Sequence, residues 1–285
     1  MFTIVLGRAR LVVLATLAAA VLASPGYAQT SHGPGKVTIP KGQHDAFVLS
    51  FGASRLAQFG RDAIWNAEDA RDHDAYWKKQ EGRMFHKVHS WLYTDETATV
   101  ANFERAINEI MARLQPGDEV ILGLSGHGGC ATPGKWEFVA HDARIPLSQF
   151  ADYVKRLSAK GARVIFIIEA CESGALLEIK VPNVVFLVSS RANEPSLNGS
   201  PYLLKGNTLF YRVLFEALSG NADTKGNGII TLEEVIAYLK KRVTALAKVD
   251  GCEQNPEIVY GDDVPQDAPL AEVVTPTTPG IVPAP

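Results

Sequence analysis

Residues 162–174 read Ala-Arg-Val-Ile-Phe-Ile-Ile-Glu-Ala-Cys-Glu-Ser-Gly, an apolar run that leads into a cysteine among small and acidic residues. A short apolar run rich in β-branched residues is typical of a strand that is buried on both faces of a sheet. A second run, Glu-Val-Ile-Leu-Gly-Leu-Ser over residues 119–125, continues into Gly126-His127-Gly128. These two strand candidates each end in a side chain that can do chemistry.

Three more apolar runs complete the set of strand candidates, at residues 46–52, 87–93 and 183–188. Apolar residues at helical spacing lie between and after the runs, over residues 100–114, 150–157, 209–218 and 231–246. Strands that alternate with amphipathic helices predict an α/β fold, in which a mainly parallel sheet is covered by helices on both faces. Ligands of such sheets bind beyond the carboxyl ends of the strands.

The overall composition is that of a globular protein. The chain has 285 residues, of which 46% are hydrophobic and 21% charged, and its formal net charge is −3. Its longest basic run is Lys240-Lys241-Arg242. Proteins that bind the phosphate backbone need a basic surface, so we expect no nucleic-acid partner.

The N-terminus has the pattern of a secretory signal peptide over residues 1–28. Arg8 and Arg10 precede an apolar run at 11–23, and Ala28 offers a small residue for cleavage. The alternative is a membrane anchor, but a thirteen-residue helix spans about 20 Å, less than the ~30 Å of a hydrocarbon core. We therefore expect a secreted or periplasmic protein without a stable membrane anchor after cleavage.

We expect the mature chain to form one domain between an N-terminal linker and a C-terminal disordered tail. Residues 29–44 are rich in Gly, Pro, Ser and His, which is typical of a linker. Residues 262–285 contain six prolines in 24 residues, a composition that predicts a disordered tail. The interval between them, residues 45–261, is the predicted domain.

His127 and Cys171 are the candidate catalytic pair. They lie 44 residues apart, after two runs separated by one helical pattern, so adjacent parallel strands would bring them together. A thiol attacks as its thiolate, and a neighbouring imidazole can accept its proton and return it to a leaving amine. Taken singly, each residue has a structural alternative: a satisfied loop histidine, and a buried, inert cysteine.

These motifs resemble those of the caspase and legumain superfamily of cysteine peptidases. The segment Glu-Ala-Cys-Glu-Ser-Gly at 169–174 is similar to legumain almost letter for letter. The segment Ser-Gly-His-Gly at 125–128 is closer to metacaspases and other bacterial caspase homologues, including the peptidase C14 group. Residues 189–196, Ser-Ser-Arg-Ala-Asn-Glu-Pro-Ser, resemble the segment that lines the substrate cleft in both branches. The choice of branch stays open.

The resemblance implies a three-layer α/β/α caspase-like fold and a cysteine endopeptidase that forms an acyl-enzyme. Cys171 would be the nucleophile and His127 the general base and then acid, while the backbone N–H groups of Gly128 and Cys171 would form the oxyanion hole. Such prepositioned donors stabilise the charge that develops in the transition state. The substrate would be a peptide or protein, and no cofactor or metal is expected.

The specificity pocket is also inferred from the resemblance. Glu169 stands where legumains and metacaspases carry a pocket acid, which implies cleavage after Asn or after Arg and Lys; the alternative is a carboxylate that caps the following turn. Ser190 and Arg191 belong to the segment similar to the cleft-lining one, and Arg191 with Arg61 would instead supply a positive pocket for Asp.

Two other functions remain open. A scaffold or binding protein would keep the fold with an inactive pair, whereas a transamidase or ligase would use an amine in place of water at the same acyl-enzyme. Cys130 and Cys252 form a tentative disulfide in an oxidising compartment. Residues 223–234 fit the frame of an EF-hand loop, but Lys225 occupies a ligand position, so we interpret the segment as a Gly-rich turn before a capped helix.

Overall fold

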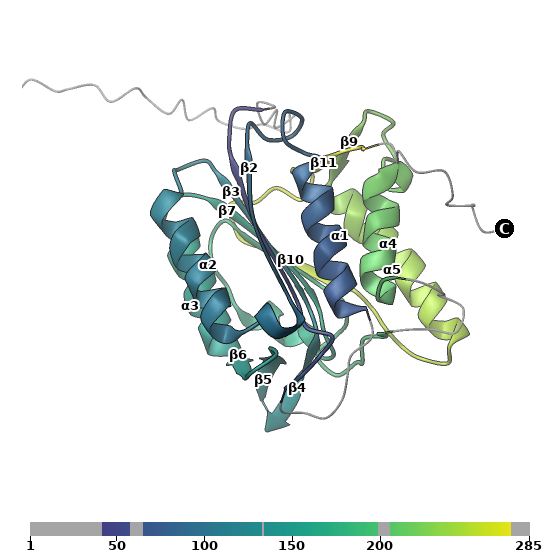
Figure 1. The fold of residues 1–285 in the computed structure, drawn as a ribbon. Helices are drawn as coiled ribbons and strands as arrows, with labels where there is room; N and C mark the ends of the chain where they lie inside the picture. The colour runs from purple at the N-terminus through teal and green to yellow at the C-terminus, as the bar shows by residue number, and fades with distance from the viewer. Residues whose placement is uncertain (1–41, 58–64, 133, 199–205, 275–285) are drawn as a thin grey trace, which may run out of the picture. The chain divides into compact units, whose positions relative to one another are not determined.

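A six-stranded sheet forms the centre of the molecule, with the strand order β10-β8-β7-β3-β1-β2 (Figure 1). Five strands are parallel, and β10 is antiparallel to β8. The strands of this sheet are β1 Ala46–Gly52, β2 Val88–Thr94, β3 Glu119–Ser125, β7 Arg163–Glu169, β8 Val184–Val188 and β10 Glu257–Tyr260. This computed structural model describes residues 42–57, 65–132, 134–198 and 206–274, so the expected signal peptide lies outside the described residues.

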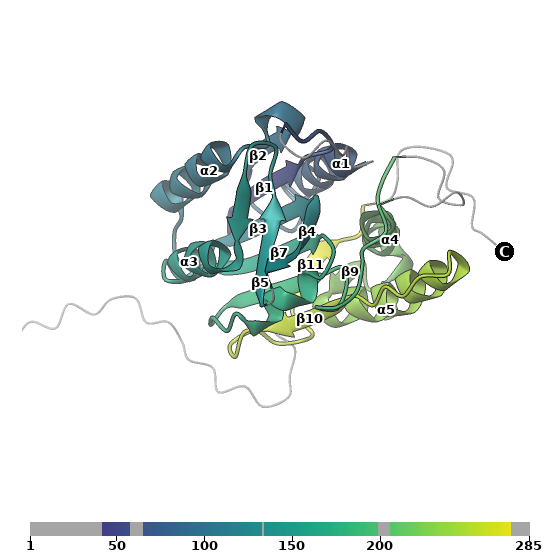
Figure 2. The same cartoon turned by 90° about the horizontal axis from the view of Figure 1, so that it is seen from below.

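Helices cover both faces of the sheet, which gives three layers (Figures 1 and 2). One face carries α2 Val100–Arg113 and α3 Leu147–Ser158. The other carries α1 Asn66–Lys78, α4 Leu209–Glu216 and α5 Leu232–Val249. Side chains alternate along each strand, so that Phe47 and Leu49 of β1 pack in the first layer of core and Val48 in the second. The predicted α/β architecture is confirmed.

Threonine caps begin three of the helices. Thr99 accepts the N–H of Asn102 at the start of α2, and Thr208 accepts that of Tyr211 at the start of α4. At α5, Thr231 and Glu234 bond reciprocally to each other's backbone N–H groups as a capping box. These caps satisfy backbone donors that have no partner inside the helix.

A small antiparallel sheet extends from the end of β3. It consists of β4 His127–Thr132, β5 Lys135–Val139 and β6 Arg144–Pro146. Because β4 begins two residues after β3 ends, the β4–β5–β6 sheet stands at the carboxyl edge of the main sheet and positions His127 there. The sequence pattern did not predict these strands.

The folded chain continues beyond residue 261, which corrects the predicted disordered tail. Residues Pro269–Glu272 form β11, which pairs with β9 Ile229–Thr231. Leu270 is fully buried, and the Pro269 carbonyl accepts a hydrogen bond from Arg163 Nη2 at 2.9 Å. Apolar side chains placed between the prolines make burial favourable here in spite of the proline content.

Within the described residues, no helix is both long enough and apolar enough to cross a bilayer.

Candidate active site

The structure brings the segments of His127 and Cys171 to one edge of the sheet. Strands β3 and β7 are neighbours in parallel, and Ser125 pairs with Glu169 at their ends. His127 and Cys171 each follow that pair by two residues, and the Gly126 N–H donates to the Glu169 carbonyl at 3.0 Å. The sequence spacing therefore predicted the correct neighbouring strands.

Two hydrogen bonds tie the hairpin that carries His127 to the turn that carries Cys171. Trp136 Nε1, on β5, donates to the Cys171 carbonyl at 3.0 Å. The Cys130 N–H, on β4, donates to the Glu172 carboxylate at 3.0 Å. The two candidate catalytic segments are thus held together by contacts from both strands of the hairpin.

Gly128 allows this close approach. A Cβ atom at residue 128 would lie 2.6 Å from the Trp136 ring and 2.8 Å from the Ala170 Cβ, so no larger residue fits without movement. The glycine therefore keeps β4 in direct contact with the residue before Cys171.

The Cys171 thiol is half-buried and contacts the Ser196 backbone. The Ser196 N–H donates to Sγ at 3.3 Å, and Sγ lies 3.8 Å from the Ser196 carbonyl. Burial raises the pKa of the thiol, and the charges of Glu169 and Glu172 raise it further, while the Ser196 N–H lowers it. Because the resting thiol holds its proton, attack requires a base.

Glu169, two residues before Cys171, is a buried acid. Its Oε2 atom accepts a hydrogen bond from Ser196 Oγ at 2.7 Å, so one residue contacts both Cys171 and Glu169. Burial raises the pKa of Glu169 to about 8, and the charge of Asp69 adds to this rise. Glu169 therefore carries a proton at neutral pH, rather than forming an exposed cap.

Asp69 is a second buried acid near the first, and the sequence analysis missed it. Its carboxylate accepts hydrogen bonds from Ser125 Oγ at 2.6 Å and from the Thr208 N–H at 3.1 Å. Burial raises its pKa to about 7. Asp69 comes from α1, where half of the buried residues are polar, so the apolar periodicity that signals a helix is weak.

A chain of side-chain amides extends this polar network. Asn66 Nδ2 donates to Ser125 Oγ at 2.7 Å, and Asn198 Nδ2 donates to Asn66 Oδ1 at 2.8 Å. Asn66 is fully buried at the start of α1. The network thus connects α1 and β3 with the chain segment that follows Ser196.

The predicted cleft-lining residues Ser190 and Arg191 are placed differently from each other. The Ser190 side chain is fully buried, and its Oγ donates to the Ala170 carbonyl at 3.2 Å. It therefore supports the residue before Cys171 and does not line an open pocket. Arg191 is exposed, but it pairs with Glu194 at 3.4 Å and Glu257 at 3.7 Å.

Gln254 holds the segment that contains Ser196 in place, and no motif marked this glutamine in the sequence. Its Nε2 atom donates to Ser196 Oγ at 2.8 Å and to the Ser189 carbonyl at 3.1 Å, and its Oε1 atom accepts the Leu197 N–H at 2.9 Å. Gln254 is fully buried in the loop before β10. It fixes the position of Ser196 and hence of the residue that contacts the thiol.

The tentative disulfide is absent: Cys130 and Cys252 are free thiols, as is Cys171. Cys130 lies on β4 with its N–H bonded to Glu172, whereas Cys252 lies after α5 with its N–H bonded to the Ala247 carbonyl. Each backbone is anchored to a different element. Arg61, the other cation considered for a positive pocket, lies outside the described residues.

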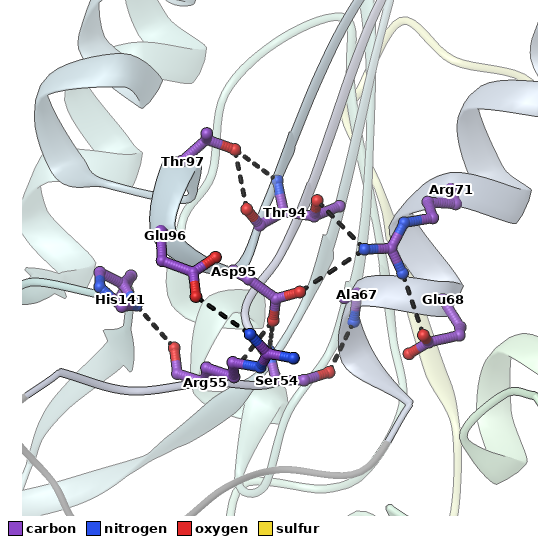
Figure 3. Close-up of polar contacts among 10 residues, drawn as sticks. All are labelled: Ser54, Arg55, Ala67, Glu68, Arg71, Thr94, Asp95, Glu96, Thr97 and His141. Carbon is purple, nitrogen blue, oxygen red and sulfur yellow. Dashed lines mark hydrogen bonds and ion pairs between the residues drawn. The ribbon is translucent and has the colours of Figure 1, made fainter.

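A separate polar cluster holds the loop after β1 at the same sheet edge (Figure 3). Asp95 Oδ1 accepts the N–H groups of Ser54 and Arg55 at 3.1 and 3.2 Å, and Asp95 pairs with Arg71 at 3.5 Å. His141 Nδ1 bonds to the Arg55 carbonyl at 2.7 Å. These groups bond mainly to backbone and to one another, which indicates a role in shaping the loop.

In the segment with an EF-hand frame, residues 223–234, acidic side chains accept hydrogen bonds from the segment's own backbone. Asp223 accepts the N–H groups of Asn227 and Gly228, and Glu234 accepts those of Thr224, Lys225 and Thr231. Lys225 Nζ lies 2.7 Å from a Glu233 oxygen. In the part of the chain that the structure describes, no group of three His, Cys, Asp or Glu residues is arranged to hold a metal ion.

Because the pKa values of Asp69 and Glu169 are raised by burial, we expect the free energy of unfolding to fall as the pH rises. The folded chain keeps both protons until about pH 7 to 8, whereas the unfolded chain releases them near pH 4 to 5. Stability from these groups is therefore complete below pH 4 and is lost as the pH rises toward 8. In thermal melts between pH 5 and pH 8, we expect Asp69→Asn to flatten this decline, while the exposed control Asp152→Asn keeps it. An unchanged slope in Asp69→Asn would refute the buried-acid assignment.

Comparisons with known proteins agree on the superfamily. The family model of the peptidase C13 family, the legumain family, matches residues 85–262, more than half of the chain. Peptidase C14 is the caspase family, so the sequence-based expectation of a C14 peptidase is not supported. No curated protein matches the chain in sequence.

Among the solved structures that match this chain, three illustrate the shared fold at low sequence identity. Protein GSU0716 from Geobacter sulfurreducens has a TM-score of 0.60 and 16% identity, covering 80% of this chain and 98% of that one. The Drosophila initiator caspase Dronc has a TM-score of 0.53 and 12% identity, over 76% and 79% of the two chains. Caspase-1 from Spodoptera frugiperda has a TM-score of 0.51 and 13% identity, over 81% and 94%. The expected caspase-like fold is confirmed.

Proposed function

Because the chain belongs to the peptidase C13 family, a family of cysteine peptidases, we propose that it is an exported cysteine endopeptidase that uses Cys171 and His127. The observation that carries the assignment of residues is the joining of the two strand ends by the Trp136 and Glu172 hydrogen bonds. Export is proposed from the N-terminal pattern of Arg8 and Arg10 followed by the apolar run at 11–23.

The proposed reaction begins with proton transfer from the Cys171 thiol to the His127 imidazole. The raised pKa of the thiol makes this step necessary at neutral pH, because the resting sulfur is protonated. The thiolate attacks the substrate carbonyl, and the backbone N–H groups of Gly128 and Cys171 stabilise the oxyanion. The His127 imidazolium then gives its proton to the leaving amine, and water hydrolyses the thioester.

Glu169 and Ser196 are the proposed floor of the specificity pocket. Ser196 contacts both the Glu169 carboxyl group and the Cys171 sulfur, which places the acid within one residue of the reacting atom. A buried acid favours a substrate side chain that carries N–H donors, either the amide of Asn or the cation of Arg or Lys. A cation bound there would lower the pKa of Glu169 and favour its ionised form.

Replacement Glu169→Gln tests this pocket. We expect the kcat/KM for peptides with Arg or Lys before the scissile bond to fall about tenfold or more, because the cation would pair with ionised Glu169 and a charged hydrogen bond is worth about 1.5–3 kcal/mol. Peptides with Asn should lose less, because their hydrogen bond to Glu169 is neutral. Kinetics on matched fluorogenic peptides measure the effect, with Glu109→Gln, at an exposed position of α2, as the control variant. If the order of substrate preference is the same in Glu169→Gln and the wild type, Glu169 is not in the pocket.

A further inference from the structure

A groove of ≈ 640 Å³ lies between the β4–β5–β6 sheet, α3 and the residues that follow the helical turn Ser173–Glu178. Its walls include apolar parts of Pro146, Leu147 and Ala151. Strand β5 and helix α3 can be followed in Figures 1 and 2. Apart from Trp136, the residues that line the groove take no part in the site described above.

Trp136 connects the groove to the candidate active site. It lines the groove, and its Nε1 atom donates to the Cys171 carbonyl at 3.0 Å. The turn Ser173–Glu178 also begins two residues after Cys171 and leads to Glu178 and Ile179 in the groove wall. The groove therefore neighbours the catalytic turn through two elements.

The β4–β5 hairpin relates the groove to one half of a bound substrate. The sheet order is β8-β7-β3, so the segment with Ser196 extends from one side of β7, and the β4–β5 hairpin with His127 extends from the other. His127 has to protonate the leaving amine, so the leaving peptide passes on the His127 side. One wall of the groove, β5, belongs to that hairpin, and the others are α3 and residues 178–180, which follow the Cys171 turn on the way to β8.

The charged side chains of the groove favour an acidic ligand. Lys135, Lys155 and Lys180 line it, and none of them has an ion-pair partner among the described residues. Of its two acids, Glu137 is paired with Arg144 at 3.7 Å, which leaves Glu178 as the remaining negative charge. The unpaired charge is predominantly positive.

We propose that this groove binds the peptide on the carboxyl side of the scissile bond and selects acidic residues there. The inference rests on the proposed peptidase function, since it assigns a further part of the same substrate. Aliphatic wall residues would contact the CH₂ groups of the peptide's side chains, and the lysines would attract the carboxylates of Asp or Glu. Exposed charge pairs are weak and screened by salt, so the selection should be moderate and should decrease at high ionic strength.

Two kinds of substrate separate this inference from the peptidase assignment. The first has a coumarin directly after the Asn, Arg or Lys residue and therefore no peptide in the groove. The second is an internally quenched peptide with the same amino-terminal half, followed by residues that are acidic, neutral or basic. For the wild type, we expect the acidic peptides to exceed the basic ones about three- to tenfold in kcat/KM.

The variants Lys155→Glu and Lys135→Glu reverse the charge in the groove. We expect each to reduce or invert the preference for acidic peptides while leaving coumarin turnover unchanged. Lys241→Glu, an exposed residue of α5 on the opposite face of the sheet, makes the same charge change and should alter neither. An acidic preference that is absent, or equal in Lys155→Glu and the wild type, would overturn the inference. Failure to cleave the coumarin substrates as well would overturn the peptidase function itself.

Discussion

Replacement of Cys171 by alanine is expected to lower peptide turnover by about 10⁴-fold or more, because it removes the atom that forms the acyl-enzyme. The fold should remain intact, since the half-buried thiol makes only weak sulfur hydrogen bonds, to the Ser196 backbone. Steady-state kinetics together with a thermal melt measure the two quantities. The matched control is Cys252→Ala, which removes a thiol outside the site and should keep full activity.

We also expect the effects of replacing Cys171 and His127 on peptide turnover to be strongly non-additive. His127→Ala alone should cost nearly as much as Cys171→Ala, and the double variant should be no slower than Cys171→Ala, because the two groups act as one unit. Independent, multiplying effects, or substantial turnover in Cys171→Ala, would rule out the proposed pair.

Replacement of Gly174 by alanine is expected to disturb both stability and activity. A Cβ atom there would lie 2.5 Å from the Ala192 nitrogen and 2.8 Å from the Arg191 carbonyl carbon. Since both are backbone atoms, the segment that leads to Ser196 has to move away from the catalytic turn. Overpacking of this kind costs about 1–3 kcal/mol, which corresponds to several degrees in melting temperature. We expect kcat/KM to fall about 100-fold as Ser196 shifts from Cys171 and Glu169.

A control separates local displacement from the general cost of replacing a glycine. Gly82 has a φ of +70° and nothing within 4 Å of an added Cβ, and asparagine tolerates this conformation. Gly82→Asn should therefore leave activity unchanged. Wild-type activity in Gly174→Ala would show that the contact between the catalytic turn and residues 191–192 is not needed.

Five strands of the main sheet and four of its covering helices could be predicted because their signals are local, whereas the edge strand β10 was not predicted. The apolar runs at 46–52 and 119–125 coincide with β1 and β3, and the other predicted strands differ by one residue at their ends. Helix α2 begins at Val100 as its pattern indicates, with Thr99 as its cap. Burial on both faces produces continuous apolar runs, which a reader of the sequence can find.

The elements that escaped prediction are short, or bury polar groups. Helix α1 buries Asn66, Asp69 and His73, so its inward face lacks the apolar stripe on which helix prediction depends. Strands β9 and β11 have three and four residues. In β11, Leu270 is buried by distant elements, which a composition count over residues 262–285 does not register.

The residues of the candidate site also differ in whether a local sequence signal could reveal them. Cys171, His127 and Glu169 follow or end apolar strands, so their place at the sheet edge could be predicted. Asp69 and Gln254 reach the site from α1 and from the loop before β10, and only the folded chain brings them there.

The most direct test of the central claim is intact-protein and peptide mass spectrometry after reaction with a peptidyl electrophile that carries Asn or Arg next to the reactive carbon. All three cysteines are free, and Cys130 is the exposed one, so simple accessibility would direct the label there. Our account predicts a single adduct on Cys171, with the rate of its formation greatly reduced in His127→Ala. Labelling of Cys130 in preference to Cys171, or an equal rate in His127→Ala, would contradict it.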